Sequence, residues 1–368
     1  MNRKSRIQDG FFTISAIVAI VATYCFFNLL KPTFAQEANS AQEKYSLYKK
    51  AMEKYHNDEF DEAIRLATLL QEQYPADPAG SFALLSSYQA LMFNYRIRLF
   101  EAKFDSLVEL SVELSKSALK KDKKNGINYF YLGSALGFRA MLNAKRKNWI
   151  ITFKDGALVS KSFEKAIAYN PQFYDSYYGL GLFNYWIGAK AKALAFLPFV
   201  KGKQKGIEQM EIAREKADFV VTHATYALIA AYYNEGNFEK SLSLTDELYE
   251  KYPHNATLNY WKGRIYIALH QWLEAKQTFE HLYELLKNAK YQSISYHIEC
   301  LYQLAKCQFN LKNYLEAQAL CQKALALEPR CDFSKELNGP IEKFSEIMNE
   351  LRDLSNESQL VVQGSISH

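Results

Sequence analysis

The residues best suited to metal chemistry gather near the C-terminal end of the chain. His297 lies three residues before Cys300, and Cys307 follows seven residues later. A histidine and two cysteines at helical spacing are potential zinc ligands. A packed helix, however, also buries cysteines as small apolar side chains. We favour packing, because the other histidines are scattered and no Cys-x-x-Cys motif is present, and we expect no metal and no cofactor.

A disulfide bond is open to only some of the four cysteines that follow residue 35. On one straight helix seven residues rise about 10.5 Å, whereas disulfide-bonded Cα atoms lie within roughly 7 Å. Cys300 therefore cannot bridge to Cys307. Any disulfide must involve Cys321 or Cys331, and we expect Cys321 to be a small buried side chain.

The sequence predicts a binding protein rather than an enzyme. It lacks His-Glu-x-x-His, a phosphate-binding Gly-rich loop and Gly-x-Ser-x-Gly, the motifs of common hydrolytic and nucleotide-dependent sites. The net charge is +5. Removal of residues 1–35 takes away four basic residues and one acidic residue and leaves +2. A chain this close to neutral is not expected to bind nucleic acid.

Residues 11–30 form an uncharged apolar run that follows Arg3, Lys4 and Arg6. Such a run is typical of a cleavable signal peptide, here ending at Thr33-Phe34-Ala35, or of a retained N-terminal membrane anchor. Both alternatives stay open for residues 1–35. Because the basic flank stays inside, we expect the rest of the chain to be exported, periplasmic or in the cell envelope, and either free or tethered by an uncleaved N-terminal helix.

The remainder is expected to be helical and repetitive. Only 15 glycines and 8 prolines occur in 368 residues, which disfavours turn-rich β folds. Half of the prolines follow a small or apolar residue by five positions, where proline ends a helix; they are Pro75, Pro171, Pro253 and Pro329. The steps from Ile229 to Gly263 and from Ser241 to Ala275 are both 34 residues.

With these steps the chain resembles the tetratricopeptide repeat family, whose unit is a 34-residue pair of antiparallel helices. The residues that carry the resemblance are Leu228, Tyr232, Gly236-Asn237-Phe238, Gly263, Tyr266, Ala275, Phe279, Leu304-Ala305, Tyr314, Ala317 and Pro329. Ile229 and Asn184 depart from the family pattern. The resemblance implies a right-handed all-α solenoid over residues 41–330.

We divide the solenoid into seven helical pairs and add two C-terminal segments. Residues 340–354 are predicted to form an amphipathic capping helix, and residues 355–368 a flexible tail. The approximate units of the solenoid are 41–77, 78–125, 126–172, 173–217, 218–254, 255–288 and 289–330.

The three units from 78 to 217 are longer than the family pattern, and their inserts mix basic with bulky apolar residues. The inserts include residues 96–103, 143–156 and 187–206. Around Phe183 and Leu197-Pro198 the chain is faintly similar to long-insert tetratricopeptide proteins related to the yeast inclusion-body clearance protein. The basic candidates for partner binding are Lys145, Arg146, Lys147, Lys190, Lys192, Lys201, Lys203 and Lys205.

A tetratricopeptide solenoid implies a concave groove that binds a protein or peptide partner. The groove candidates are Tyr226, Tyr233, Asn234, Asn259, Lys262 and Tyr266. We therefore predict a non-catalytic scaffold or adaptor. The alternatives are a protein that binds an anionic membrane surface or ligand through the basic inserts, and inserts that merely lengthen the helices.

Overall fold

The computed structural model describes residues 42–145, 148–190 and 201–366. The predicted signal peptide or anchor, residues 1–35, lies outside them. The chain divides into two compact units, residues 1–49 and 50–368; residues 42–49 of the first are helical. Among the described helices none is both long and apolar enough to cross a bilayer. The remaining description concerns the second unit.

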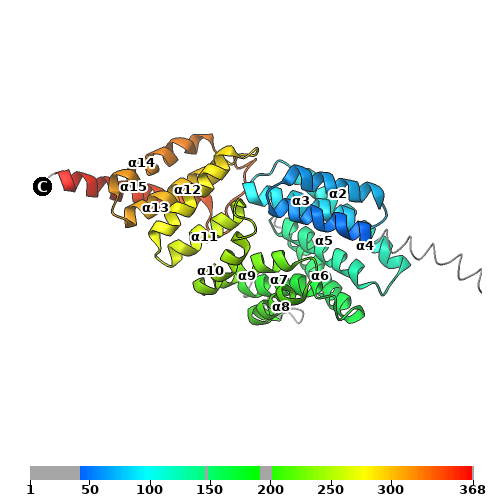
Figure 1. Ribbon diagram of the computed structural model, residues 1–368. Helices are drawn as coiled ribbons and strands as arrows, with labels where there is room; N and C mark the ends of the chain where they lie inside the picture. Colours follow the sequence, from blue (N-terminus) through cyan, green and yellow to red (C-terminus); the bar gives the residue numbers. More distant parts are fainter. Residues whose placement is uncertain (1–41, 146–147, 191–200, 367–368) are drawn as a thin grey trace, which may run out of the picture. The chain divides into compact units, whose positions relative to one another are not determined.

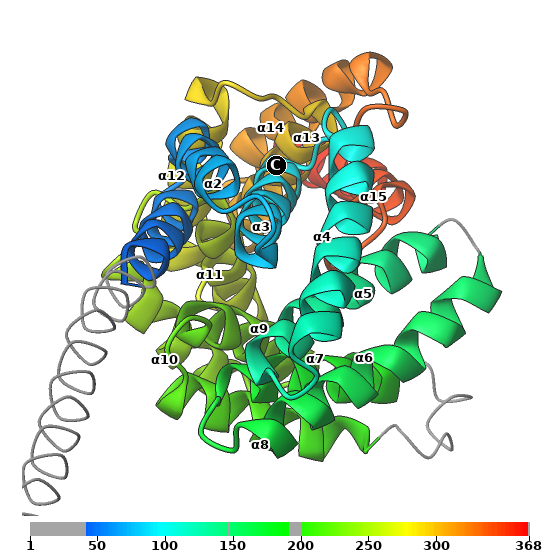
Figure 2. The ribbon, with the colours of Figure 1, turned by 90° about the vertical axis from the view of Figure 1, so that its right-hand side faces the viewer.

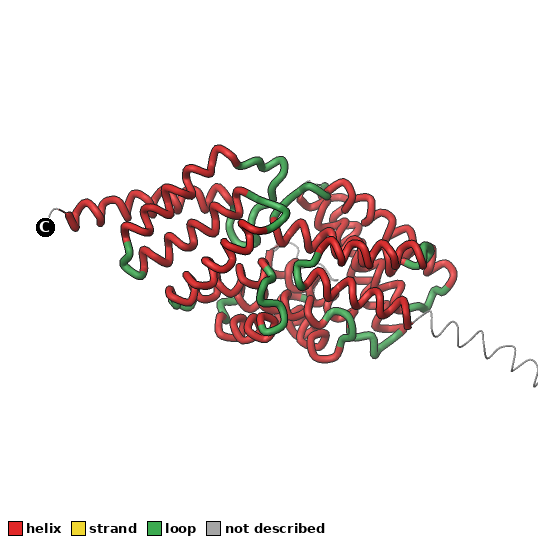
Figure 3. The backbone as a smooth tube through the Cα atoms, turned by 45° about the horizontal axis from the view of Figure 1, so that its top comes forward, coloured by secondary structure: helices red, strands yellow, loops and turns green. Residues whose placement is uncertain are grey.

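The second unit is built from helical hairpins joined by short loops (Figures 1 and 3). This confirms the predicted all-α fold. After the helical residues 50–56, the helices are α2 (Phe60–Gln73), α3 (Pro78–Tyr95), α4 (Glu101–Lys121), α5 (Gly126–Lys145), α6 (Trp149–Tyr169), α7 (Asp175–Lys190), α8 (Gly202–Lys216), α9 (Val221–Asn234), α10 (Phe238–Tyr249), α11 (Ala256–Ala268), α12 (Trp272–Asn288), α13 (Ile294–Asn310), α14 (Tyr314–Leu327) and α15 (Phe344–Ile366).

The second insert, residues 143–156, lies largely in the ends of two long helices, and half of the third lies outside the described residues. Helices α4, α5 and α6 contain 20 or 21 residues, whereas α10 and α11 contain 12 and 13. Residues 96–100 form a loop instead, and Ile97 makes an isolated antiparallel bridge with Glu336. This first insert is therefore joined to the C-terminal part of the chain.

The first helices of successive hairpins form an inner layer that closes on itself. Helix α3 contacts α5, α5 contacts α7, α7 contacts α9, and α9 contacts α11. Helix α11 in turn contacts α3 (Figure 2). An open solenoid would leave the two ends of this series apart. Here the five helices form a closed ring.

Polar side chains from the first two hairpins cap helix α11 at the point of closure. The backbone N–H groups that begin a helix have no partner within it. Ala256 N donates to Asp58 Oδ2 (3.1 Å) and Thr257 N donates to Asn94 Oδ1 (2.9 Å). The Asn255 side chain also donates to Asp58 Oδ1 (2.7 Å). The helix dipole favours a carboxylate at this end, so Asp58 and Asn94 hold α11 in place.

A buried ion pair joins the end of α3 to α13. Arg96 Nη1 donates to Glu299 Oε2, and both residues are buried. The guanidinium lies 3.6 Å from the centre of the Tyr296 ring, a cation–π arrangement. Tyr260 OH donates to the second Glu299 oxygen (2.8 Å). Burial lowers the pKa of Arg96, but the Glu299 carboxylate more than offsets this and raises the pKa overall. The guanidinium therefore stays charged.

Four of the hairpins turn through a residue with positive φ placed two positions before an aromatic residue. Only one of these turn residues is glycine, so the other three adopt a backbone conformation that disfavours a side chain. The four pairs are Asp58 with Phe60, Gly236 with Phe238, His270 with Trp272, and Lys312 with Tyr314.

Helices α7 and α8 approach each other at two glycines. A Cβ atom at Gly206 would lie 2.5 Å from Tyr185 N and 2.7 Å from Gly181 O. Real Cβ atoms do not come so close to backbone atoms, so only glycine fits there. A Cβ atom at Gly181 would likewise lie 2.7 Å from Gly206 O, so both glycines allow the two helices to pack closely.

The C-terminal helix α15 is longer than predicted. It runs to Ile366, past the predicted end at Leu354 and through the segment expected to be a flexible tail. Its buried residues Ile347, Met348 and Leu351 lie before the predicted end. Ser358 is also buried, and its hydroxyl donates to Leu354 O (2.7 Å).

Candidate interaction surfaces

The structure places one predicted groove residue inside the molecule and another, Tyr226, half-buried against a neighbouring ring. Asn259 is fully buried, and its side-chain amide donates to Pro253 O (2.8 Å) and Asn255 O (3.0 Å). Tyr226 stacks on His56, with ring centres 6.1 Å apart. His56 of the first hairpin covers one face of the Tyr226 ring. The Asn259 amide is enclosed by the backbone that leads into α11.

The inner face at this point carries a cluster of tyrosines and histidines. Tyr55 OH donates to His223 Nε2. The His56 ring lies 4.9 Å from the His223 ring and 5.5 Å from the Tyr252 ring, centre to centre. Burial lowers the pKa of His223 to about 4 and that of His56 well below its usual value. Both imidazoles are therefore neutral at pH 7, as Tyr55 requires of its hydrogen-bond acceptor.

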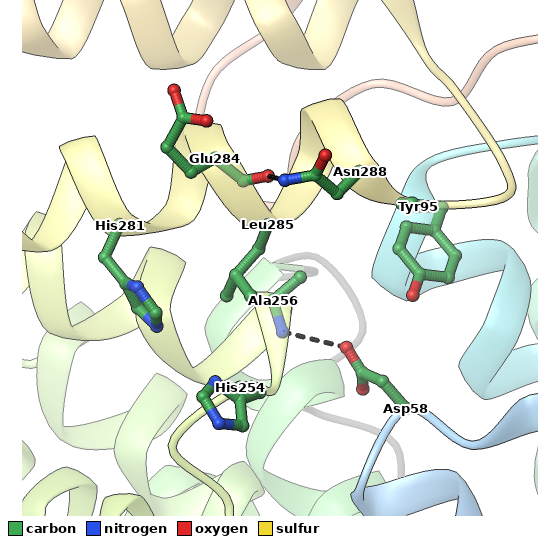
Figure 4. A pocket seen from close by; sticks show the side chains of 9 residues that line it. Asp58, Tyr95, His254, Ala256, His281, Glu284, Leu285 and Asn288 are labelled. Atoms are coloured by element: carbon green, nitrogen blue, oxygen red, sulfur yellow. Dashed lines mark hydrogen bonds between the residues drawn. The ribbon is translucent and has the colours of Figure 1, made fainter.

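A pocket of about 340 Å³ opens beside the cap of α11 (Figure 4). His281, Glu284 and Asn288 line it from α12, and Asp58 faces them from the opposite side (Figure 4). The rings of His254 and His281 lie 5.8 Å apart. No group of three metal-ligating side chains occurs in the part of the chain that the structure describes.

Asp58 is an acidic residue in this pocket, and both oxygens of its side chain already accept hydrogen bonds. It accepts hydrogen bonds from Asn94 (2.8 Å), Asn255 (2.7 Å) and Ala256 N (3.1 Å). Burial nevertheless raises the pKa of Asp58 to about 7. Because its two oxygens hold the cap of α11 together, we assign Asp58 to structure rather than to catalysis.

Lys262 and Tyr266 remain accessible, together with two neighbours from α10. Both are half-buried on the same side of α11. Lys262 Nζ lies 2.9 Å from Asp246 Oδ1, 3.9 Å from the centre of the Tyr249 ring and 5.9 Å from that of Tyr266. We call Asp246, Tyr249, Lys262 and Tyr266 the α10–α11 surface. It combines aromatic rings with a paired cation, which suits contact with a protein.

Tyr233 and Asn234 are at the end of α9. The Tyr233 ring lies 5.4 Å from the Trp261 ring, edge to face. Asn234 is exposed, and its amide donates to Tyr185 OH (2.8 Å). Their side chains therefore support the packing of α9 against α7 and α11.

The described lysines of the third insert have acidic partners. Lys201 pairs with Glu164 (3.2 Å), Lys203 with Glu235 (2.7 Å) and Lys205 with Glu208 (3.0 Å). Their charges are therefore locally compensated. Three of the remaining basic candidates, Arg146, Lys147 and Lys192, lie outside the described residues. For Lys145 and Lys190 the structure describes the helical backbone but not the side chain. A role for them in partner binding stays a prediction.

The cysteines and His297 have structural surroundings. Cys300, Cys307, Cys321 and Cys331 are free thiols, and only Cys331 is not buried. Burial raises the pKa of Cys307 and Cys321 to about 12, so neither is a reactive thiolate at neutral pH. His297 Nε2 donates to Gln292 Oε1 (2.6 Å).

Sequence reasoning missed the residues that close the inner layer. Asn255 carried a local signal, because asparagine is a common first cap of a helix. Glu299 carried a weaker one, as a single acid within the apolar run Ile298–Leu301. Arg96 and Asp58 carried none, since their partners lie about 200 residues away along the chain.

Comparison with known proteins places a repeat in the last hairpin. Residues 298–331 match the tetratricopeptide repeat model, a range that ends just after α14. The chain matches no curated protein.

Several solved structures are similar to the chain. The C-terminal part of a TPR repeat-containing protein from Cytophaga hutchinsonii is 20% identical, with 77% of this chain and 95% of that one covered and a TM-score of 0.42. A chain of the APC/C hetero-tetramer Cut9–Hcn1 is 14% identical, with 73% and 43% covered and a TM-score of 0.48. A thermophilic TPR protein from Thermus thermophilus is 17% identical, with 61% and 98% covered and a TM-score of 0.40.

Proposed function

We propose that this chain, a helical-repeat protein that contains a tetratricopeptide repeat, is a non-catalytic adaptor that binds a protein partner in the cell envelope. The repeat match at residues 298–331 carries the proposal, because tetratricopeptide repeats generally act as scaffolds for protein–protein interaction. The apolar segment at residues 11–30 supports the location, as a signal peptide or an anchor.

The α10–α11 surface is the part of the predicted groove that remains available to a partner. Tyr226 and Asn259 are occupied by packing within the chain. Lys262 and Tyr266 are half-buried, as Tyr226 is, but they lie beside Asp246 and Tyr249 of α10. Tyrosine and cationic side chains in such positions dominate the energetics of many interfaces. We therefore place partner contact on α10 and α11.

The experiment is site-specific photo-crosslinking in cells that express the full chain. A photoreactive amino acid replaces Tyr266 in one variant and Tyr314 in the control; Tyr314 is also a half-buried tyrosine, on α14. Crosslinked products are identified by mass spectrometry, and the affinity of the purified partner is then measured. We expect a discrete product from position 266 only, and a loss of about tenfold or more in affinity for Tyr266→Ala.

Two results would overturn the proposal. Equal crosslinking from positions 266 and 314 would remove the α10–α11 surface as the binding site. Turnover of a substrate by the purified full chain would show that it is an enzyme. The same mass spectra report the N-terminal residue of the mature chain, and an intact chain in the cytoplasmic fraction would contradict export.

A further inference from the structure

The first turn of α6 presents four large apolar side chains to solvent. Trp149 is 54% exposed, Ile150 83%, Ile151 37% and Phe153 42%. The rest of α6 behaves as an ordinary packed helix, with Val159, Phe163 and other residues of one face buried. The apolar turn therefore stands apart from the core of the hairpin.

These four residues spread over more than half of the helix circumference instead of forming one narrow stripe. Successive residues of a helix are rotated by about 100°, so Ile150 lies on the opposite side of the helix from the buried Val159. A groove in a partner protein covers one face of a helix. A bilayer also contacts the sides of an inserted turn, and exposure wider than one face therefore favours a lipid occupant.

The charged residues in the sequence that leads into this turn are all basic. No aspartate or glutamate occurs between residues 123 and 154. Lys154 is exposed directly after Phe153. The next acid, Asp155, is buried, and both its oxygens accept hydrogen bonds from Arg139 (2.7 and 2.8 Å). Exposed apolar residues beside an exposed lysine match the surface of an anionic membrane.

We propose that Trp149, Ile150, Ile151 and Phe153 form a membrane wedge that enters the headgroup region of an anionic bilayer, with Lys154 at the phosphate level. This surface is distinct from the α10–α11 surface proposed for a protein partner. The wedge adds a second contact with the membrane to whatever residues 11–30 provide.

The test measures binding of the full chain to vesicles of phosphatidylcholine alone and with phosphatidylglycerol. The wedge variant is Ile150→Glu with Ile151→Glu. The control is Leu273→Glu with Leu315→Glu, which adds the same charge at exposed leucines (52% and 71%) of α12 and α14. Any contribution of residues 11–30 is common to all three proteins. Circular dichroism checks that each is folded.

We expect the wild type to bind anionic vesicles more tightly than neutral ones, and the wedge variant to lose about tenfold or more of the anionic binding. The control should stay within about twofold of the wild type. Brominated lipid should quench the fluorescence of Trp149 if this residue enters the bilayer. The contribution of Trp149 is the difference in quenching between the wild type and Trp149→Phe.

Three results would overturn the proposal. One is equal binding by the wedge variant and the wild type; another is an equal loss in the control. The third is equal binding of the wild type to neutral and to anionic vesicles. If the wedge variant instead loses a crosslinked protein partner while vesicle binding is unchanged, the apolar turn is a protein contact. Failure of the Tyr266 crosslink would leave these measurements untouched.

Discussion

At the scale of the residue, Arg96 is the side chain on which the closure of the inner layer depends most. It is buried, its partner Glu299 is buried, and 203 positions separate them in the sequence. Removal of Arg96 takes away the close ion pair of the buried Glu299 carboxylate, which keeps only the Tyr260 hydroxyl and Arg264, whose Nη1 lies 3.8 Å away. The effect should therefore exceed that of any surface ion pair.

Arg96→Ala is expected to lower the free energy of unfolding by about 3–5 kcal/mol, measured by urea denaturation of the full chain. Arg65→Ala is the control, because Arg65 pairs with Glu62 on the exposed side of α2 and should leave stability nearly unchanged. Similar values for the two variants would contradict our account. Arg96→Met combined with Glu299→Met should recover much of the loss.

His223→Gln should change the pH dependence of stability. The pKa of His223 is lowered by burial to about 4, against an ordinary value near 6.5. A base with a depressed pKa contributes stability that is present above pH 6.5 and is lost as pH falls towards 4. The stability advantage of the wild type over the variant should therefore shrink through that window.

The measurement is the unfolding midpoint in urea between pH 8 and pH 4.5 for both proteins. His254→Gln serves as the control, since His254 is exposed. A constant difference between wild type and His223→Gln across this range would show that His223 titrates normally in the folded chain.

At the scale of the element, glycine at the crossing of α7 and α8 is required by backbone contact. Gly206→Ala is expected to lower the free energy of unfolding by about 3 kcal/mol. Gly137→Ala, within α5, should raise it by about 0.5–1 kcal/mol, because the nearest atom to the new Cβ would lie 4.0 Å away. Thermal unfolding of both variants tests the assignment, and the same sign for both would refute it.

The positive-φ turns allow a stabilising change. Lys312 has φ of 64°, which costs a non-glycine residue about 1–2 kcal/mol. Glycine removes this cost but loses more conformational entropy on folding. We therefore expect Lys312→Gly to raise the free energy of unfolding by about 0.5–1 kcal/mol. Lys323→Gly, within α14, should lose about 1 kcal/mol. A lower free energy of unfolding for Lys312→Gly than for the wild type, measured by urea denaturation, would contradict the strain argument.

The sequence predicted these elements well, because their signals are local. The aromatic residues that begin second helices, such as Phe238 and Trp272, are visible as a pattern. The 34-residue step between Ile229 and Gly263 is equally direct. The length of α15 was underestimated because small polar residues after Ser355 resemble a tail, whereas Ser358 is buried in the fold.

At the scale of the whole molecule, the sequence predicted the class of fold but not the closure of the inner layer. Each contact of the closure joins residues from distant hairpins, as Asn94 and Thr257 do. Repeat patterns describe only neighbouring hairpins. Tyr226 and Asn259 were expected to line an open groove, but Asn259 is buried and Tyr226 is half-buried against His56.

Closure should make the described hairpins unfold together. In an open repeat array the ends fray independently. Here the hairpin that contains Asp58 holds the start of α11, so amides near residues 60–70 and 258–267 should exchange with solvent in one cooperative step. Hydrogen exchange followed by mass spectrometry checks this. Arg96→Ala should separate the two segments, and independent exchange in the wild type would contradict coupling.

The distance between Arg96 and Glu299 also has a consequence for biosynthesis. A ribosome adds about 5–20 residues each second, so a gap of 203 positions corresponds to roughly 10–40 seconds between the two side chains. During that interval the first two hairpins display Arg96 without Glu299, while Asp58 and Asn94 can bond to each other but lack the start of α11. A chaperone that shields this edge during synthesis would act on the chain at its most vulnerable stage.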